Sequence, residues 1–201
     1  VQCRIGSSSA PAGMAIRALT GTGKVQTGHL FSDNIIFAGK GTGAITLSGA
    51  TSNCVVSGNT IKNTASHPDR AFGVWCIGTT EGGDADADSF VADITISDNC
   101  MFNMGIGVLL DEITERCTVS GNTMQATAGN NSKCVEIRGL AGTVAEPKPS
   151  RHHSISGNTL SGADYGVYAA VGSNAFDGEG PSIVGNSFKG HAVSGIYLGA
   201  I

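Results

Sequence analysis

The amino-acid sequence predicts an all-β solenoid, a chain wound into about seven stacked turns, or rungs, of short strands. One observation is an eight-residue pattern with Asn at its sixth position, which recurs with small edits along most of the chain. Another is a second short element, typified by Gly-Val-x-Val, that lies between successive copies. Both elements alternate apolar and other residues with a period of two, which indicates strands. Self-similarity of this kind is the signature of a solenoid.

The repeated pattern is clearest at 117–124, where it reads Cys-Thr-Val-Ser-Gly-Asn-Thr-Met. Close copies lie at 54–61, 94–101, 153–160 and 181–188, and a looser copy lies at 29–36. The asparagines stand at positions 34, 59, 99, 122, 158 and 186, so the steps are 25, 40, 23, 36 and 28 residues. The basic unit is therefore 23 to 28 residues, with insertions in two units.

A tight bend is expected within each copy, because Gly or Asp precedes the Asn and both types tolerate left-handed backbone geometry. Asparagines at one position of successive turns can hydrogen-bond to the backbone and to each other. We therefore predict a stack at one corner of the solenoid, formed by Asn59, Asn99, Asn122, Asn158 and Asn186.

The second element supplies an inward and an outward face, because side chains alternate along a strand. The expected inward residues are Ile16, Ile45, Val74, Val108, Val135, Val167 and Ile196. The next residue of each strand forms an outward column of Arg17, Thr46, Trp75, Leu109, Glu136, Tyr168 and Tyr197. Two residues further on, a second outward column is formed by Leu19, Ser48, Ile77, Asp111, Arg138, Ala170 and Gly199.

This arrangement resembles the right-handed parallel β-helix, and the resemblance covers nearly the whole chain. The repeat is similar to the one shared by pectate-lyase-like enzymes, sugar epimerases and phage tailspikes. Such a repeat is specific for the fold rather than for one function.

Length and composition fit one domain spanning residues 1–201, since 201 residues with 40% apolar content are accounted for by a single solenoid. The chain starts without Met and stops inside a strand, so we expect a piece of a longer protein. The net charge of −4 and the lack of a basic stripe argue against nucleic acid as a partner. No run of 18 apolar residues is present, so no membrane span is expected.

The rungs differ in their turns. Residues 1–28 form the first rung, and 29–51 form a compact second rung with Phe31, Ile36, Ile45 and Leu47 pointing inward. Insertions follow at 66–70, 79–90, 126–133, 139–151 and 172–180. They flank the Gly-Val-x-Val strand, because inserted loops do not fit a narrow solenoid core. This strand is therefore expected to be the floor of a groove.

Six cysteines are present, and Cys54 and Cys117 occupy the same inward position of the repeat. We predict free, buried thiols, since cysteine acts as a small hydrophobe in such positions. Reduced cysteines place folding in a cytoplasm. We expect no cofactor and no metal, because the acidic segment 84–88 lacks the Gly and the Glu of a calcium loop.

Aromatic residues gather in the first outward column, which holds Trp75, Tyr168 and Tyr197. Flat aromatic faces beside carboxylates and arginines suit sugar rings, so we predict substrate binding by these three residues with Arg138 and Arg17. Rungs about 4.8 Å apart would place Trp75 and Tyr168 roughly 14 Å apart, the length of a short oligosaccharide. The alternative is that the aromatics pack under loops or against a partner chain.

The candidate catalytic residues are Glu136 and Asp111, which lie in adjacent rungs with Cα atoms roughly 8 Å apart. Their carboxyls can fall within the roughly 6.5 to 9.5 Å separation of an inverting glycosidase. The alternative is that both acids simply pair with Arg138. A lyase would need a base, for which Arg138 with His152 or His153 can be considered, although His153 occupies an inward position.

The low charge, the polar solenoid and the cysteines together resemble the central β-helix of a phage tailspike or a related depolymerase. This resemblance implies binding, and often cleavage, of a bacterial surface polysaccharide by a homotrimer that is extracellular or virion-associated. Paired acids favour a glycosidase over a lyase. The alternatives are a non-catalytic β-helix shaft or adhesin module, and a pectate-lyase-like uronate lyase or epimerase.

Overall fold

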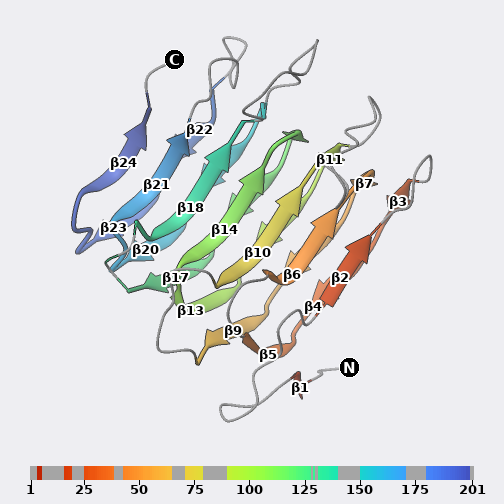
Figure 1. The fold of residues 1–201 in the computed structure, drawn as a ribbon, viewed down its shortest axis with the longest axis horizontal. Helices are drawn as coiled ribbons and strands as arrows, with labels where there is room; N and C mark the ends of the chain where they lie inside the picture. The colour runs from red at the N-terminus through yellow and green to blue at the C-terminus, as the bar shows by residue number, and fades with distance from the viewer. Residues whose placement is uncertain are drawn as a thin grey trace.

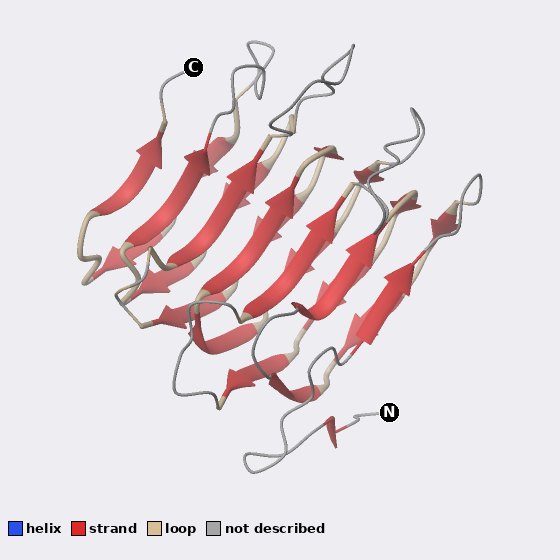
Figure 2. Cartoon of the chain, viewed as in Figure 1, coloured by secondary structure: helices blue, strands red, loops and turns tan. Residues whose placement is uncertain are grey.

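The structure is a computed structural model. It describes residues 4–5, 16–19, 25–38, 43–64, 71–78, 90–127, 129, 131–139, 150–170 and 180–199. This part of the chain consists of strands and turns, with no helix (Figure 2). Its strands pair in parallel and form four sheets, here named A to D. The chain passes through the sheets in turn and returns beside its previous strand, which is the arrangement of a parallel β-helix (Figure 1).

Sheets A and B contain seven strands each. Sheet A consists of β1 (Arg4–Ile5), β5 (Ile35–Ala38), β9 (Thr60–Asn63), β13 (Cys100–Met104), β17 (Thr123–Ala126), β20 (Thr159–Ser161) and β23 (Ser187–Lys189). Sheet B consists of β2 (Ile16–Leu19), β6 (Gly43–Ser48), β10 (Phe72–Ile77), β14 (Ile106–Asp111), β18 (Lys133–Arg138), β21 (Tyr165–Ala170) and β24 (Ser194–Leu198).

The two remaining sheets are smaller. Sheet C consists of β3 (Gln26–Thr27), β7 (Thr51–Ser52), β11 (Val91–Ala92) and β15 (Thr114–Glu115). Sheet D consists of β4 (Leu30–Ser32), β8 (Val55–Ser57), β12 (Thr95–Ser97), β16 (Thr118–Ser120), β19 (Ser154–Ser156) and β22 (Ser182–Val184). The two-residue strands of sheet C were not anticipated, because two residues are too short to show a period of two.

Each copy of the repeated pattern contains two strands, one in sheet D and one in sheet A, with the predicted bend between them. The residue before the Asn adopts a left-handed backbone, with φ of 56° at Asp98 and 66° at Gly121. Glycine is favoured at such a position because it has no Cβ to clash, and Asp tolerates it. The choice of Gly or Asp in the sequence thus follows directly from the bend.

The predicted asparagine stack is confirmed. The side-chain Nδ2 of each Asn donates to Oδ1 of the next, at 2.9 Å from Asn99 to Asn122 and at 3.0 Å from Asn122 to Asn158. The backbone N–H of Asn99 donates to the same oxygen of Asn122 at 3.0 Å. The stack includes all five predicted residues and also Asn34. Because these groups are buried, the stack satisfies polar atoms that would otherwise be left without partners.

The core follows the predicted alternation. Ile45, Val74, Val108, Val135 and Val167 of sheet B are fully buried in one cluster. Ile36 and Leu47 are also fully buried, and Phe31 packs partly against the cluster. Ile196 differs, with 43% of its surface exposed, because β24 has only β21 as a neighbour in the described part of the sheet.

The cysteine prediction is also confirmed for the described residues. Cys54, Cys76, Cys100, Cys117 and Cys134 are free thiols, and all except Cys100 are buried. Burial raises the pKa of the Cys117 thiol to about 12. Inert thiols of this kind act as small apolar side chains in the core.

His153 lies inside the solenoid, as its inward position predicted. Its Nδ1 accepts the backbone N–H of Cys117 at 3.2 Å, and its Nε2 lies 2.8 Å from the hydroxyl of Ser150. Thr114 completes the group, with its hydroxyl 2.7 Å from that of Ser150. Burial lowers the pKa of His153 to about 4, so the ring is neutral at physiological pH.

A search of the described residues for a helix with the length and apolar character needed to span a membrane finds none.

Candidate functional site

The candidate site is the outer face of sheet B, the side turned away from the core. The register places Trp75 beside Leu109, Leu109 beside Glu136, Glu136 beside Tyr168 and Tyr168 beside Tyr197. The predicted outward column is therefore a continuous row across neighbouring strands. The backbone of Arg17 on β2 extends the row, in register with Thr46, which neighbours Trp75; the side chain of Arg17 lies outside the described part.

Arg138 on β18 brings the two predicted acids together. Its Nε and Nη2 donate to Oε1 and Oε2 of Glu136, each at 3.0 Å. Its Nη1 lies 3.9 Å from Oδ2 of Asp111 on β14. The acid and arginine pairing that stood as the alternative to catalysis is thus present in this structure.

Asp111 is a buried carboxyl with a raised pKa. Its Oδ2 accepts a hydrogen bond from Nε1 of Trp75 at 3.1 Å. Burial raises the pKa of Asp111 to about 6, and the neighbouring Glu112 acts in the same direction, while Arg138 and the bond from Trp75 oppose the shift. A carboxyl with this pKa exchanges its proton near neutral pH, as a general acid must.

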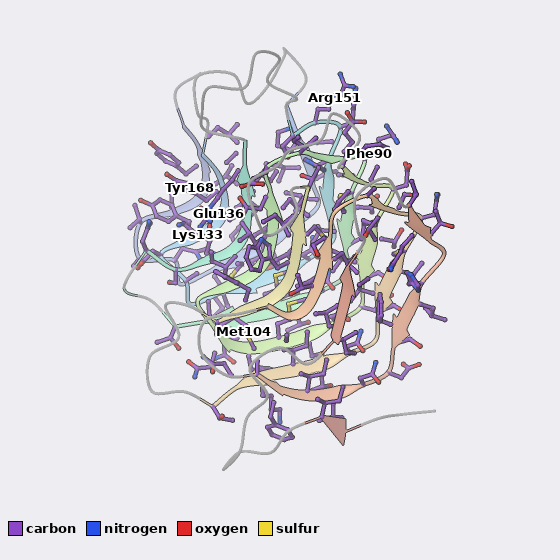
Figure 3. The ribbon with its side chains drawn as sticks, turned by 45° about the vertical axis from the view of Figure 1, so that its right-hand side comes forward. Phe90, Met104, Lys133, Glu136, Arg151 and Tyr168 are labelled. Atoms are coloured by element: carbon purple, nitrogen blue, oxygen red, sulfur yellow. The ribbon has the colours of Figure 1, made fainter. Side chains whose placement is uncertain are left out.

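Lys133 is a member of the site that the sequence reasoning missed. Its Nζ lies 3.2 Å from Oε1 of Glu136 and 4.8 Å from the ring centroid of Tyr168. Figure 3 shows Lys133, Glu136 and Tyr168 side by side on this face. The ammonium therefore bridges two adjacent strands of sheet B and shares Glu136 with Arg138.

The sequence feature that could have identified Lys133 is its position three residues before Glu136. The first residue of these strands shares the outer face with the fourth, as ring contacts between Phe72 and Trp75 at 5.3 Å and between Tyr165 and Tyr168 at 4.9 Å show. Strict alternation assigns the first residue to the inward set. In β18 alternation fails because the second and third residues, Cys134 and Val135, both lie in the core.

The aromatic residues form two groups on this face. Tyr168 and Tyr197 are stacked, with ring centroids 4.9 Å apart and planes 8° apart. Lys133 lies over Tyr168 from the strand on its other side, so both faces of that ring are occupied. A ligand reaches Tyr168 at its edge and hydroxyl, whereas Trp75 belongs to a separate group near Asp111.

Covered and partly exposed positions alternate across the face. Thr46, Leu109 and Glu136 expose no more than 2% of their surfaces. Trp75, Arg138 and Tyr168 are partly exposed, and Tyr197 is exposed. The expected groove floor is therefore not one continuous open surface. The insertions expected beside it fall largely outside the described residues.

The two histidines considered for a lyase, His152 and His153, lie away from this face. His153 is in the core, and both His152 and His153 precede β19 of sheet D. Among the residues that the structure describes, no group of three or more His, Cys, Asp or Glu side chains is placed to hold a metal ion. The acidic segment 84–88 lies outside the described residues.

The fold defines an all-β protein with parallel strands stacked in sheets, in the manner of a parallel β-helix. Comparison of the chain with protein-family models, with curated proteins and with solved structures finds no match.

Proposed function

We propose that the chain binds a bacterial surface polysaccharide on the outer face of sheet B and hydrolyses it. The observation that carries this proposal is Asp111, a carboxyl titrating near neutral pH, held by Trp75 and placed beside the Glu136 and Arg138 pair. Glycoside hydrolysis uses one carboxylic acid to protonate the leaving oxygen and a second carboxylate as base or nucleophile. Asp111 is assigned the acid and Glu136 the second carboxylate.

Sugar binding is assigned to the partly exposed residues around these acids. Trp75 offers an aromatic surface, and Arg138 offers hydrogen-bond donors to hydroxyls. Tyr168 and Tyr197 contribute their edges and hydroxyl groups at the other end of the face. Ligand-binding sites typically combine apolar and aromatic side chains with a few polar groups that orient the ligand, as these residues do.

The wider setting belongs to the same proposal. The solenoid is a right-handed β-helix of about seven rungs, and three copies of it associate in the manner of a phage tailspike. It folds in a cytoplasm and works outside the cell or on a virion. The free cysteines support cytoplasmic folding, because an oxidising compartment favours disulfides.

A non-catalytic polysaccharide-binding module is the second candidate. The observation that favours it is Glu136, whose two oxygens are held by Arg138 and whose Oε1 also pairs with Lys133. A carboxylate fixed by two cations is a poor base. In this case the acids hold Arg138 and Lys133 in position, and the ligand is bound without cleavage.

The experiment that separates these candidates is incubation with a panel of capsular and O-antigen polysaccharides, followed by sizing of the products. Hydrolysis shortens the polymer without absorbance at the unsaturated-uronate band, whereas a lyase produces that absorbance. A binding module retains the polymer and leaves its size unchanged. If no polysaccharide in the panel is bound or shortened, the proposal is wrong.

A further inference from the structure

The charges around Glu136 do not balance locally. The side chain of Lys133 is only 5% exposed, and Glu136 is its ion-pair partner at 3.2 Å. A buried ammonium needs a counter-charge, because desolvation of an unpaired ion is costly. The negative charge of Glu136 is therefore shared between Lys133 and Arg138, and it does not fully neutralise either.

Asp111 is the other acid beside Arg138, and it supplies a negative charge only when ionised. It faces Trp75 on β10, Arg138 and Glu136 on β18, and its own neighbour Glu112. Burial favours the neutral form of such a carboxyl. Whenever Asp111 holds a proton, it no longer offsets the positive charge of Arg138, whose Nη1 lies 3.9 Å from its Oδ2.

One edge of the Arg138 guanidinium has no hydrogen-bond partner among the described residues. Its Nε and Nη2 are committed to Glu136. Within the described part of the chain, no acceptor lies within hydrogen-bond distance of Nη1, and the side chain is 38% exposed. The five donors of a guanidinium form a planar fork, so Nη1 and the second hydrogen of Nη2 remain for a further partner. This pair of donors matches the two oxygens of a carboxylate or a phosphate.

We infer that the free edge of Arg138 binds an anionic group on the polysaccharide, so that the ligand is an acidic glycan bearing carboxylate or phosphate substituents. This inference rests on the proposed function and adds the chemical class of the ligand. Trp75 lies against the same Asp111 oxygen that faces Arg138, so a sugar ring at Trp75 places its substituent near Nη1. A neutral glycan would offer no negative charge to pair with Arg138.

Anion binding at Arg138 also favours the protonated form of Asp111. The bound anion reduces the positive potential of Arg138 and brings a second negative charge close to Asp111. Both effects keep the proton on the residue that is assigned to donate it. The acidic ligand is therefore taken up together with a proton.

The test compares one bound polysaccharide with a neutral form of the same polymer. The polysaccharide that the native chain binds is treated with carbodiimide and borohydride to reduce its carboxylates, or with hydrofluoric acid to remove its phosphates. Isothermal titration then measures both forms with the native chain, with Arg138→Gln and with Arg116→Gln. Arg116 is a matched control, because its guanidinium holds Asp93 through two bonds of 2.7 and 2.8 Å at the turn between β15 and β16, outside sheet B.

The expected result is that the native chain and Arg116→Gln bind the acidic polymer at least about tenfold more tightly than its neutral form, a difference that one charge-assisted contact can supply. Arg138→Gln loses this preference. Arg138→Lys, which keeps the charge but not the fork, retains part of it and serves if the glutamine variant does not fold. Equally tight binding of the acidic and neutral forms by the native chain, or an unchanged preference in Arg138→Gln, overturns the inference while the proposed function stands. Binding of no polysaccharide by the native chain instead overturns the proposed function.

Discussion

The indole of Trp75 and the carboxyl of Asp111 are joined across β10 and β14 by a hydrogen bond of 3.1 Å. The bond stabilises the ionised carboxylate, and therefore it limits the rise in pKa that burial causes. Trp75 is thus placed both to contact a sugar ring and to tune the acid beside it.

Replacing Trp75 by Phe separates these two roles, because Phe keeps an aromatic ring but has no N–H donor. The pKa of Asp111 is expected to rise above its native value of about 6, and the pH dependence of cleavage to move to higher pH. Trp75→Ala removes the ring as well and should weaken oligosaccharide binding by about 1 to 3 kcal/mol. Carbon-detected NMR titration of Asp111 measures the first effect. An unchanged titration in Trp75→Phe would contradict the proposed tuning.

Asp111 is expected to reduce the stability of the native fold at neutral pH. Its folded pKa is raised to about 6 from an ordinary value of 3.8, so the folded state holds its proton more tightly than the unfolded state does. Stability is then lost as pH rises from about 4 to 6 and stays lower above that range. Asp111→Asn should raise the free energy of unfolding at pH 7 by about 3 kcal/mol.

Chemical denaturation at pH 4 and pH 7 checks this expectation. The gain from Asp111→Asn should nearly vanish at pH 4, where the native carboxyl is largely protonated. Asp93→Asn is the control, because the pKa of Asp93 is lowered by its hydrogen bonds with Arg116 and its change should destabilise. Equal effects of Asp111→Asn at both pH values would be inconsistent with a raised pKa.

His153 should make the fold sensitive to acid. Its folded pKa is lowered to about 4 from 6.5, so the unfolded state binds the proton more tightly. Stability is full above about pH 6.5 and falls as pH drops toward 4, by an amount on the order of 3 kcal/mol. His153→Gln should flatten this slope, and NMR should show the native ring neutral down to about pH 4. A ring that titrates near 6.5 in the folded protein would refute the assignment.

The asparagine stack should be strongest in its middle. Asn122→Ala removes an oxygen that accepts both the N–H and the Nδ2 of Asn99, and it leaves the carbonyl of Ile96 without its donor. Leaving buried polar groups unpaired costs about 1 to 3 kcal/mol each. Asn186→Ala, near the end of the stack and only half-buried, should cost less. Thermal unfolding of the two variants measures the difference, and equal losses would argue against cooperative stacking.

The fold was largely predictable because the same local requirement, a left-handed bend, recurs in every copy of the repeat. Only a few residue types tolerate this bend, so Gly121 and Asp98 indicate the position of the corner in the sequence. The second left-handed corner, between sheets C and D, was harder to predict because its residue types are mixed: Asn53 and Asp93 suit this geometry, whereas Arg116 has no preference for it.

The site was predictable only in part. Alternation along strands placed Asp111 and Glu136 on the outer face, where Arg138 joins them. It misplaced Lys133, because two consecutive residues after it, Cys134 and Val135, both face the core and break the period of two. It also could not show that Tyr168 is covered on both faces, since stacking depends on side-chain torsions that no pattern encodes.

The most direct test of the account is turnover by Asp111→Asn and Glu136→Gln on a polysaccharide that the native chain shortens, with Asp93→Asn as the matched control. Both site variants should retain binding and lose turnover by about a hundredfold or more, the scale expected when a general acid or base is removed. Asp93→Asn, which breaks an ion pair with Arg116 away from sheet B, should retain native turnover. Full activity in Asp111→Asn would contradict the central claim that the outer face of sheet B is a hydrolytic site.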